Sequence, residues 1–192
     1  MSIRRLRDCV QDLTRLADRS IADPEAMIAG GQDILGRLIA QDDWLPDFAT
    51  VPHAQFYRQY LLHCDPLERF SIVSFVWGPG QKTPIHDHTV WGLVGMLRGE
   101  ERSRRFERTG DALTEAGTEM LHPGQIDVVS PTHGDIHQVA NAFADRASIS
   151  IHVYGANIGR VHRNVYDADT GTSKPFVSGY NSDVVPNIWS MQ

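Results

Sequence analysis

Short segments of high β propensity, separated by turn residues, are the feature of this sequence that most limits its fold. They lie at residues 70–77, 90–97, 102–107, 125–129, 136–139 and 148–154. Glycine, proline, asparagine or aspartate separates consecutive segments, as in Gly78-Pro79-Gly80. Since no helical pattern intervenes, the spacing predicts an antiparallel sandwich or barrel.

The N-terminal third has a helical period instead. Apolar residues recur at three- and four-residue steps, namely Ile3, Leu6, Val10, Leu13 and Leu16. This spacing predicts one apolar face of an amphipathic helix. Asp23 followed by Pro24 is typical of the start of a second helix, which we expect to be interrupted at Gly30 and Gly31. We also expect a short third helix near residues 54–62.

The length of 192 residues fits one domain. Within it we expect a helical segment at 1–68, a β-barrel at 69–165 and a segment at 166–192 that wraps the surface. This last stretch is rich in Asp, Thr, Gly, Ser, Asn and Pro. Hydrophobic residues make up 41% of the chain, which is enough for a sizeable core and excludes a disordered chain.

Charge and cysteine content exclude several functions. The chain carries 18 Lys and Arg against 24 Asp and Glu, whereas a nucleic-acid-binding protein normally has a basic surplus. Cys9 and Cys64 are too few for a disulfide framework and indicate a reducing compartment. The charged start lacks a signal peptide, and no apolar run reaches the roughly 18 residues of a membrane span. We therefore expect a soluble cytoplasmic protein without nucleic-acid or membrane partners.

Histidine is the residue type with the most informative placement. His86 and His88 lie two apart in a predicted β region, so both imidazoles point to one face and can bind one ion. A second cluster contains His133 and His137. Imidazole suits iron, zinc, copper and nickel, so the ligand type alone does not name the metal.

The spacing around both clusters resembles the two sequence boxes of the cupin superfamily over residues 70–155. The first box consists of Gly80, His86, His88 and Gly99. The second consists of Gly124, Pro131, Gly134, His137 and Asn141. The resemblance implies a mainly β fold, the double-stranded β-helix or jelly-roll-like barrel, preceded here by N-terminal α-helices. It also implies that the metal ligands are His86, His88 and His137.

One difference from the general cupin pattern limits the resemblance to a smaller group of cupins. The general cupin box has a metal-binding glutamate at the position of Gly92, so this chain offers neutral imidazoles alone. Such a site leaves the charge of a divalent ion uncompensated and several positions open. It favours an anionic, bidentate substrate and leaves room for dioxygen. The glutamate-free pattern resembles the thiol dioxygenases of the cysteine dioxygenase group.

Ser150, His152 and Tyr154 extend this resemblance. They alternate along a predicted strand, so they share one face, and they match the outer-sphere Ser–His–Tyr array of that group. The resemblance implies catalytic roles for all three. The Tyr154 hydroxyl would lie near the oxygen site, His152 would hold the tyrosine, and Ser150 would orient the histidine.

The chain departs from the cysteine-specific branch of the group at three places. Gln59 stands at the position of an upstream arginine, with Arg58 as the alternative one residue away. Residues 90–93 contain no cysteine to crosslink to the tyrosine, and Gly155-Ala156 replaces the Ser-Pro after it. These features resemble the bacterial 3-mercaptopropionate dioxygenases, in which an arginine downstream of the tyrosine binds the substrate carboxylate.

Arg163 fits this carboxylate-binding role best, with assistance from Gln59, and Arg160 is the alternative. A guanidinium offers paired donors that match a carboxylate. The resemblance implies a non-haem Fe(II) enzyme that adds both atoms of O2 to the sulfur of 3-mercaptopropionate, giving 3-sulfinopropionate. The alternatives are cysteine as substrate, another cupin oxygenase or isomerase with a different metal, and a non-catalytic cupin that binds a small ligand. The sequence leaves open whether the protein is a monomer or a homo-oligomer.

We assign no ligand role to the remaining histidines. We expect His133 in a loop or supporting the site, and surface or capping positions for His53, His63, His122 and His162. We expect three tryptophans to pack in the core, namely Trp77, Trp91 and Trp189.

Overall fold

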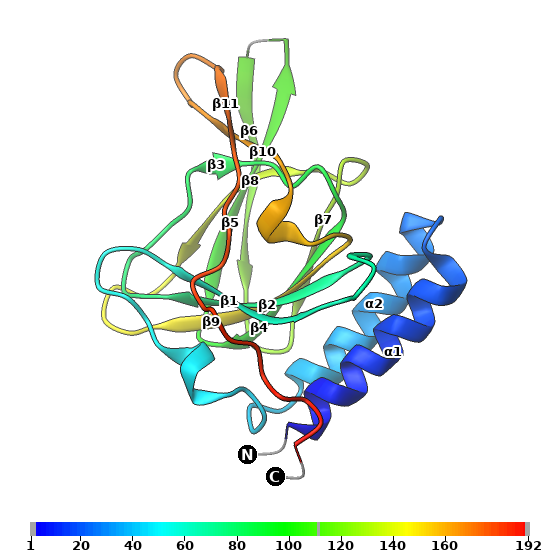
Figure 1. The fold of residues 1–192 in the computed structure, drawn as a ribbon. Helices are drawn as coiled ribbons and strands as arrows, with labels where there is room; N and C mark the ends of the chain where they lie inside the picture. Colours follow the sequence, from blue (N-terminus) through cyan, green and yellow to red (C-terminus); the bar gives the residue numbers. More distant parts are fainter. Residues whose placement is uncertain (1–2, 111, 191–192) are drawn as a thin grey trace.

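Two helices begin the fold in the computed structural model, which describes residues 3–110 and 112–190 (Figure 1). The helices α1 (Arg4–Ser20) and α2 (Pro24–Ile39) pack side by side. The predicted apolar face of α1 is buried, and Asp23 caps α2 by accepting a hydrogen bond from the Ala26 N–H at 3.1 Å. No helix in the described ranges is long and apolar enough to cross a membrane.

The predicted interruption of α2 is wrong, because the helix runs through Gly30 and Gly31 without a break. A Cβ atom on Gly30 would lie 2.9 Å from the Leu16 side chain, and one on Gly31 would lie 2.8 Å from that of Leu93. The missing side chains therefore let α2 approach both α1 and the neighbouring sheet closely.

The strands form two antiparallel sheets that face each other (Figure 1). The first sheet has the order β1 (Arg58–Cys64), β2 (Ser71–Trp77), β9 (Ser148–Tyr154), β4 (Gly92–Arg98), β7 (Ile126–Val129). The second has the order β11 (Ser173–Phe176), β10 (Arg163–Tyr166), β3 (Ile85–His86), β8 (Ile136–Asn141), β5 (Glu101–Thr109), β6 (Ala112–Leu121). Two short 3-10 helices, η1 (Asp47–Thr50) and η2 (Ile158–Arg160), lie in the connections.

The central strands β2 and β9 are buried on both faces. Ile72 of β2 and Ile151 of β9 belong to the core between the first sheet and the helices. Phe75 and Tyr154 belong to a second cluster inside the barrel. Because successive side chains of a strand point to opposite faces, this alternation also turns His152 toward the barrel interior.

The predicted mainly β barrel with N-terminal helices is confirmed. The predicted short helix near residues 54–62 is wrong, since β1 covers most of that range and pairs with β2. Tyr60 and Leu62 alternate into the core there, so long-range pairing with β2 decides the structure. Trp77 and Trp91 are buried as predicted, but the prediction for Trp189 is wrong because its side chain is 66% exposed.

The C-terminal segment runs across the barrel after β10. Its strand β11 pairs with β10, and the Asn181 N–H donates to the Gln59 carbonyl at 2.8 Å. In return the Gln59 N–H donates to the Asn181 side chain at 2.7 Å. Ile188 then packs into the core beside the helices. The segment is therefore tied to both sheets and to the helices.

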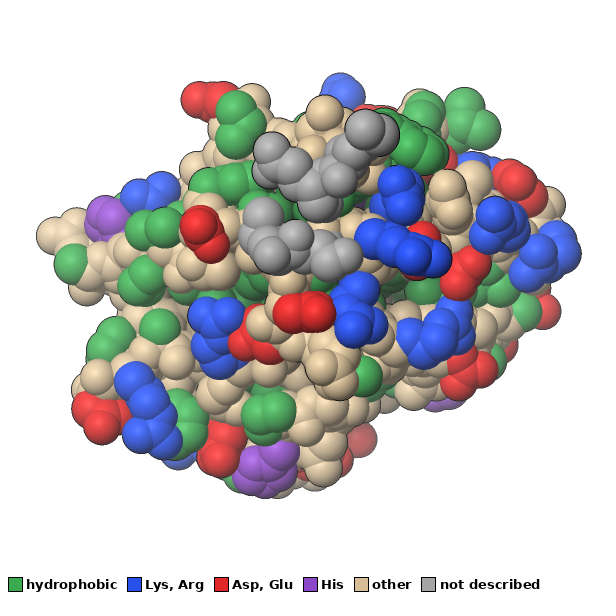
Figure 2. All heavy atoms as spheres, turned by 90° about the horizontal axis from the view of Figure 1, so that it is seen from below, with side chains coloured by type: hydrophobic (Ala, Val, Ile, Leu, Met, Phe, Trp, Pro, Cys, Tyr) green, Lys and Arg blue, Asp and Glu red, His purple; other side chains and the backbone are tan. Residues whose placement is uncertain are grey.

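Acidic and basic side chains are mixed on the face of the molecule drawn in Figure 2. Ion pairs on the described surface include Arg37 with Asp12 at 2.7 Å and Arg98 with Asp42 at 2.7 Å. The face shown is therefore neither uniformly acidic nor uniformly basic.

Candidate metal centre and active site

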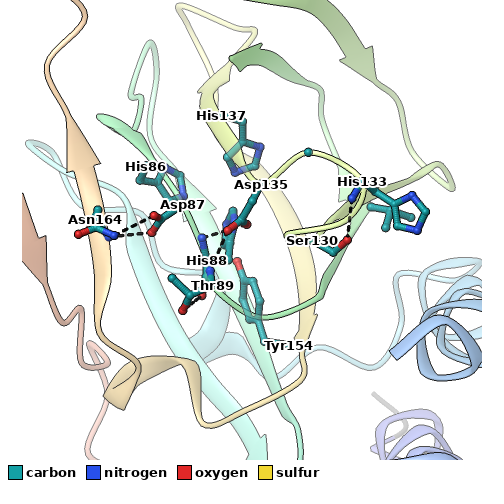
Figure 3. Close-up of polar contacts among 12 residues, drawn as sticks. His86, Asp87, His88, Thr89, Ser130, His133, Asp135, His137, Tyr154 and Asn164 are labelled. Carbon is teal, nitrogen blue, oxygen red and sulfur yellow. Dashed lines mark hydrogen bonds and ion pairs between the residues drawn. The ribbon is translucent and has the colours of Figure 1, made fainter. Parts of the chain in front are cut away.

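Three histidines meet inside the barrel (Figure 3). His86 and His137 are direct partners in the pairing of β3 with β8, and His88 follows two residues after His86. The ring centroids are 4.8 Å apart in each of the three pairs. One nitrogen of each ring lies within 4.8 Å of the others, and all three side chains are buried. The structure therefore brings together the histidines that the sequence predicted as ligands.

Each imidazole has a partner at its Nδ1 atom, which leaves the Nε2 atom available for the centre of the cluster. The Nδ1 partners of His86, His88 and His137 are the Pro84 carbonyl at 3.1 Å, the Asp135 carboxylate at 2.9 Å and the Ser103 hydroxyl at 3.3 Å. Outer partners of this kind fix the orientation of a metal-binding histidine.

His86 and His137 are buried and neutral, which is the form of an imidazole that binds a metal. Burial lowers the pKa of His86 to about 3, and the neighbouring His88 adds to the shift. Burial also lowers the pKa of His137 well below its usual range. Neutral nitrogen donors with fixed orientations fit a divalent transition metal such as iron.

Asp135 holds the turn that carries His88, and the sequence reasoning missed it. Its carboxylate accepts hydrogen bonds from the backbone N–H groups of His88 at 3.0 Å and Thr89 at 2.8 Å, in addition to the contact with the His88 ring. Thr89 has a φ of 60°, which a β-branched residue rarely adopts, so the turn needs this support. The available signal was the position of Asp135 beside Gly134 in the second box.

Gly92 lies where the general cupin box has its glutamate, and the structure explains the small residue. Gly92 and Tyr154 are direct partners in the pairing of β4 with β9. A Cβ atom on Gly92 would lie 2.7 Å from the Tyr154 ring and 2.9 Å from Val129. The tyrosine ring therefore takes the space that any side chain at position 92 would need.

Ser150, His152 and Tyr154 form a hydrogen-bonded chain along the inner face of β9. His152 Nε2 lies 2.8 Å from the Ser150 hydroxyl, and His152 Nδ1 lies 2.8 Å from the Tyr154 hydroxyl. Phe75 stacks on the His152 ring at 4.0 Å, and the Tyr154 ring stacks near His88 at 5.5 Å. These hydrogen bonds therefore connect Ser150 and His152 to the histidine cluster through Tyr154.

Burial keeps the hydrogen-bonded side chains of His152 and Tyr154 uncharged. It lowers the pKa of His152 well below the usual range of histidine and raises the pKa of Tyr154 above that of a free phenol. Tyr154 therefore stays a hydroxyl, which can donate one hydrogen bond and accept others.

Arg163 lines a cavity of about 190 Å³ together with His86. The residue is 3% exposed, and its guanidinium stacks on the Phe176 ring at 4.6 Å and donates to the Ser178 hydroxyl at 2.6 Å. Among the described residues no carboxylate forms an ion pair with it, and its Nε has no hydrogen-bond partner. Burial lowers the pKa of Arg163, but arginine remains protonated in proteins. The cavity therefore holds an unpaired positive charge.

Gln59 lines the same cavity, and its buried side-chain oxygen has no hydrogen-bond partner within residues 3–110 and 112–190. The two alternatives from the sequence lie elsewhere. Arg160 is on the surface beside Glu68, at 3.4 Å. Arg58 contacts the Phe56 ring at 5.4 Å and does not line the cavity.

Asp87 connects the histidine cluster to the strand that carries Arg163. Its carboxylate accepts from the Asn164 N–H at 2.7 Å and from the Asn164 side chain at 2.9 Å (Figure 3). It also accepts from the Tyr166 hydroxyl at 2.6 Å. Asp87 therefore faces away from the metal cluster and fixes β10 against β3.

The remaining histidines lie outside the cluster. His133 lies away from the three-histidine cluster (Figure 3) and contacts Glu25 of α2 at 2.8 Å. The half-buried or exposed others are His53, His63, His122 and His162.

The double-stranded β-helix fold, with a cluster of three histidines inside the barrel, defines this protein as a cupin with a metal site. A solved structure with this fold is an uncharacterized conserved protein with a double-stranded β-helix domain from Klebsiella pneumoniae, with a TM-score of 0.50 and 16% identity. The similarity covers 66% of this chain and 99% of that one. The family profile "Cysteine dioxygenase type I" matches residues 48–168, so the chain belongs to the cysteine dioxygenase type I family, a family of metalloenzymes.

Curated relatives include cysteine dioxygenase type 1 from Bos taurus and from Homo sapiens. Each is 23% identical to this chain over 118 residues, which is 59% of this chain. The match spans 58% of the length of each relative. The family is therefore established, while the substrate is a separate question.

Proposed function

We propose that this protein is a non-haem Fe(II) thiol dioxygenase that converts 3-mercaptopropionate to 3-sulfinopropionate. The observation that carries the proposal is the buried, unpaired guanidinium of Arg163 in the cavity that also reaches His86. An unpaired charge inside a protein is costly, so its presence points to an anionic ligand. The proposed substrate has a carboxylate for Arg163 and a thiolate for the metal.

His86, His88 and His137 would hold the iron through their Nε2 atoms. When bound, Fe(II) supplies the site at which the thiolate and dioxygen meet and the redox chemistry that joins both oxygen atoms to sulfur. The protein ligands are neutral, so the thiolate compensates part of the metal charge. The absence of a side chain at Gly92 keeps the number of protein ligands at three.

Arg163 and Gln59 would bind the carboxylate end of the substrate. The cavity volume of about 190 Å³ is below the roughly 300–1,000 Å³ of sites for drug-sized ligands, which suits a molecule of a few heavy atoms. Phe176 and Ser178 hold the guanidinium in place, so its orientation does not depend on the ligand. A fixed carboxylate end limits the positions that the sulfur can take.

Tyr154 would orient the reactants at the other side of the metal site. Its hydroxyl stays protonated and is fixed by His152, which is fixed in turn by Ser150. A preorganised donor of this kind stabilises negative charge that develops on oxygen during the reaction.

Two observations favour 3-mercaptopropionate over cysteine. The residues that line the cavity include no Asp or Glu, so the ammonium group of cysteine would enter next to Arg163 without a counter-charge. The two cysteines of the chain are Cys9 in α1 and Cys64 at the end of β1, so neither lies on β4 opposite Tyr154. Cysteine is the second candidate, since the curated relatives are named for it.

The test is oxygen uptake by purified, iron-loaded protein with three thiols in parallel: 3-mercaptopropionate, cysteine and cysteamine. We expect the highest kcat/KM for 3-mercaptopropionate, a lower value for cysteine and the lowest for cysteamine, which has no carboxylate. A higher kcat/KM for cysteine would assign cysteine as the substrate. No uptake with any thiol, despite bound iron, would refute the dioxygenase proposal.

A further inference from the structure

Glu101 is a buried carboxyl group that the proposed mechanism does not use. It is the first residue of β5 and is 1% exposed. Neither of its oxygens has a hydrogen-bond partner among the described residues, and no described cation pairs with it. The preceding residue, Glu100, is more exposed and lies 3.4 Å from His122. The two adjacent glutamates therefore have different environments, and Glu101 is the one that faces the barrel interior.

The Ser150 hydroxyl and the Trp77 indole N–H are the polar groups beside the Glu101 carboxyl, and both favour its ionised form. Trp77 also donates to the Ser150 hydroxyl at 3.3 Å. Asn141 of β8 lies opposite Glu101 in the strand pairing, but its amide N–H groups already donate to backbone carbonyls. Glu101 is thus placed at the inner end of the chain formed by Ser150, His152 and Tyr154.

The charged and titratable groups around Glu101 favour a proton on its carboxyl. From β7, Asp127 adds negative charge, although Arg105 is paired with it. From β9, His152 and Tyr154 are neutral. Burial raises the pKa of Glu101 to about 7, against the smaller opposing effects of its polar neighbours. The carboxyl therefore changes charge near neutral pH.

A hydrogen bond between the Glu101 carboxyl and the neighbouring Ser150 hydroxyl would let the protonation state of Glu101 set the direction of the hydrogen bonds from Ser150 through His152 to Tyr154. A protonated Glu101 would donate to Ser150, so that Ser150 donates to His152 Nε2 and His152 Nδ1–H donates to Tyr154. The Tyr154 proton is then free to point into the substrate site. An ionised Glu101 would accept from Ser150, which then accepts from His152 Nε2–H, while His152 Nδ1 accepts a hydrogen bond from the Tyr154 hydroxyl. The two states differ by one proton, and a neutral imidazole with one N–H permits only these two directions.

We propose that Glu101 is a positioning residue, whose protonated form directs the chain through Ser150 and His152 so that Tyr154 donates its hydrogen bond toward the metal site. The proposal rests on the proposed dioxygenase function, because it concerns the tyrosine used in that reaction. This role explains why a carboxyl group is buried at a position where an apolar side chain would otherwise pack.

The test compares Glu101→Gln, Glu101→Leu and the matched control Glu100→Gln in iron-loaded protein. Glutamine donates an N–H to Ser150 and cannot ionise. We expect Glu101→Gln to keep kcat within about threefold of the wild type below neutral pH and to lose the decline of kcat above it. We expect Glu101→Leu to lower kcat about tenfold or more at all pH values, with KM and iron content unchanged, because nothing then directs Ser150.

Glu100→Gln should keep the wild-type pH profile, which includes any effect of the thiol's own ionisation. An infrared difference titration adds a readout without substrate: a protonated-carboxyl band should disappear above neutral pH in the wild type and be absent from Glu101→Gln. A normal wild-type rate with an unchanged alkaline decline in Glu101→Gln, or no such band, overturns the role of Glu101 alone. No oxygen uptake by the wild type with any thiol overturns the proposed function and this role with it.

Discussion

Gly92 and Tyr154 face each other across β4 and β9, and a methyl group on residue 92 would lie 2.7 Å from the tyrosine ring. This contact links two features of the site. Position 92 offers no carboxylate, so the candidate metal site consists of histidines only, and the Tyr154 ring occupies the space beside Gly92. A glutamate at position 92 and the observed tyrosine position exclude each other.

Gly92→Ala should therefore displace Tyr154 without removing a metal ligand. We expect kcat to fall about tenfold or more, since misplacing a catalytic group by about 1 Å is costly. Iron content should stay at the wild-type level. Gly117→Ala is the matched control, because an added Cβ there meets nothing within 4 Å. Unchanged kcat in Gly92→Ala would show that the ring is not needed where it lies.

Arg163→Ala should weaken binding of thiols that carry a carboxylate. Loss of a hydrogen bond to a charged group costs about 1.5–3 kcal/mol, so we expect KM to rise about 10- to 100-fold. Arg163→Lys keeps the charge but not the paired donors, so its KM should lie between those of the wild type and Arg163→Ala. The control is Arg160→Ala, since Arg160 lies on the surface beside Glu68. An unchanged KM in Arg163→Ala would remove this residue from carboxylate binding.

Removing the charge of Arg163 should not weaken the fold. The buried guanidinium has no carboxylate partner in the described part of the chain, so its desolvation opposes folding. We expect the melting temperature of ligand-free Arg163→Met, which retains a long apolar side chain, to equal or exceed that of the wild type. A melting temperature several degrees lower would mean that Arg163 serves the structure instead of a ligand.

Asp135→Ala should weaken metal binding although Asp135 is not a ligand. It removes the partner of His88 Nδ1 and the support of the turn at Thr89. Outer partners of metal-binding histidines contribute about 10- to 100-fold in affinity, and we expect a loss of this size in iron competition with a chelator. Asp145→Ala, at an exposed position, is the control. Equal iron affinity in the two variants would contradict the role of Asp135.

Stability of the metal-free protein should fall as the pH decreases below about 6.5. His86, His137 and His152 have lowered pKa values in the fold. The unfolded chain therefore binds protons near pH 6.5 that the folded chain does not bind. Glu101 opposes this trend, because its raised pKa means that it takes up its proton more readily when folded. One glutamate offsets only part of the effect of the histidines.

The measurement is urea unfolding of metal-free protein at about pH 7.5 and about pH 5.5, where we expect the free energy of unfolding to drop by roughly 1–2 kcal/mol. Bound metal should reduce the difference, since the ligands are then held unprotonated. A higher stability at the lower pH would contradict the neutral state of the buried imidazoles.

Much of the fold could be predicted from the sequence because its signals are local. Strand segments between turn residues predicted the barrel, and the resemblance to the two cupin boxes implied the cluster of His86, His88 and His137. The strand β1 could not be predicted, because the same residues fit a helix until β2 pairs with them. Local pattern and long-range pairing conflict there, and pairing decides.

The surroundings of the site were harder to predict, because they come from distant parts of the chain. Phe176 and Ser178 reach Arg163 only after the C-terminal segment crosses the barrel. Glu101 and Ser103 point inward from β5, where the rule of apolar residues inside predicts no polar groups. Inward polar residues of this kind mark function, and only the folded arrangement shows which groups they meet.

The most direct measurement of the central claim is the isotopic composition of the product made from 3-mercaptopropionate under ¹⁸O₂ by the iron-loaded protein. We predict 3-sulfinopropionate in which both sulfinate oxygens are labelled, with one O2 consumed for each thiol. A disulfide product, a sulfinate labelled at one oxygen or at none, or no turnover would contradict the assignment as a thiol dioxygenase.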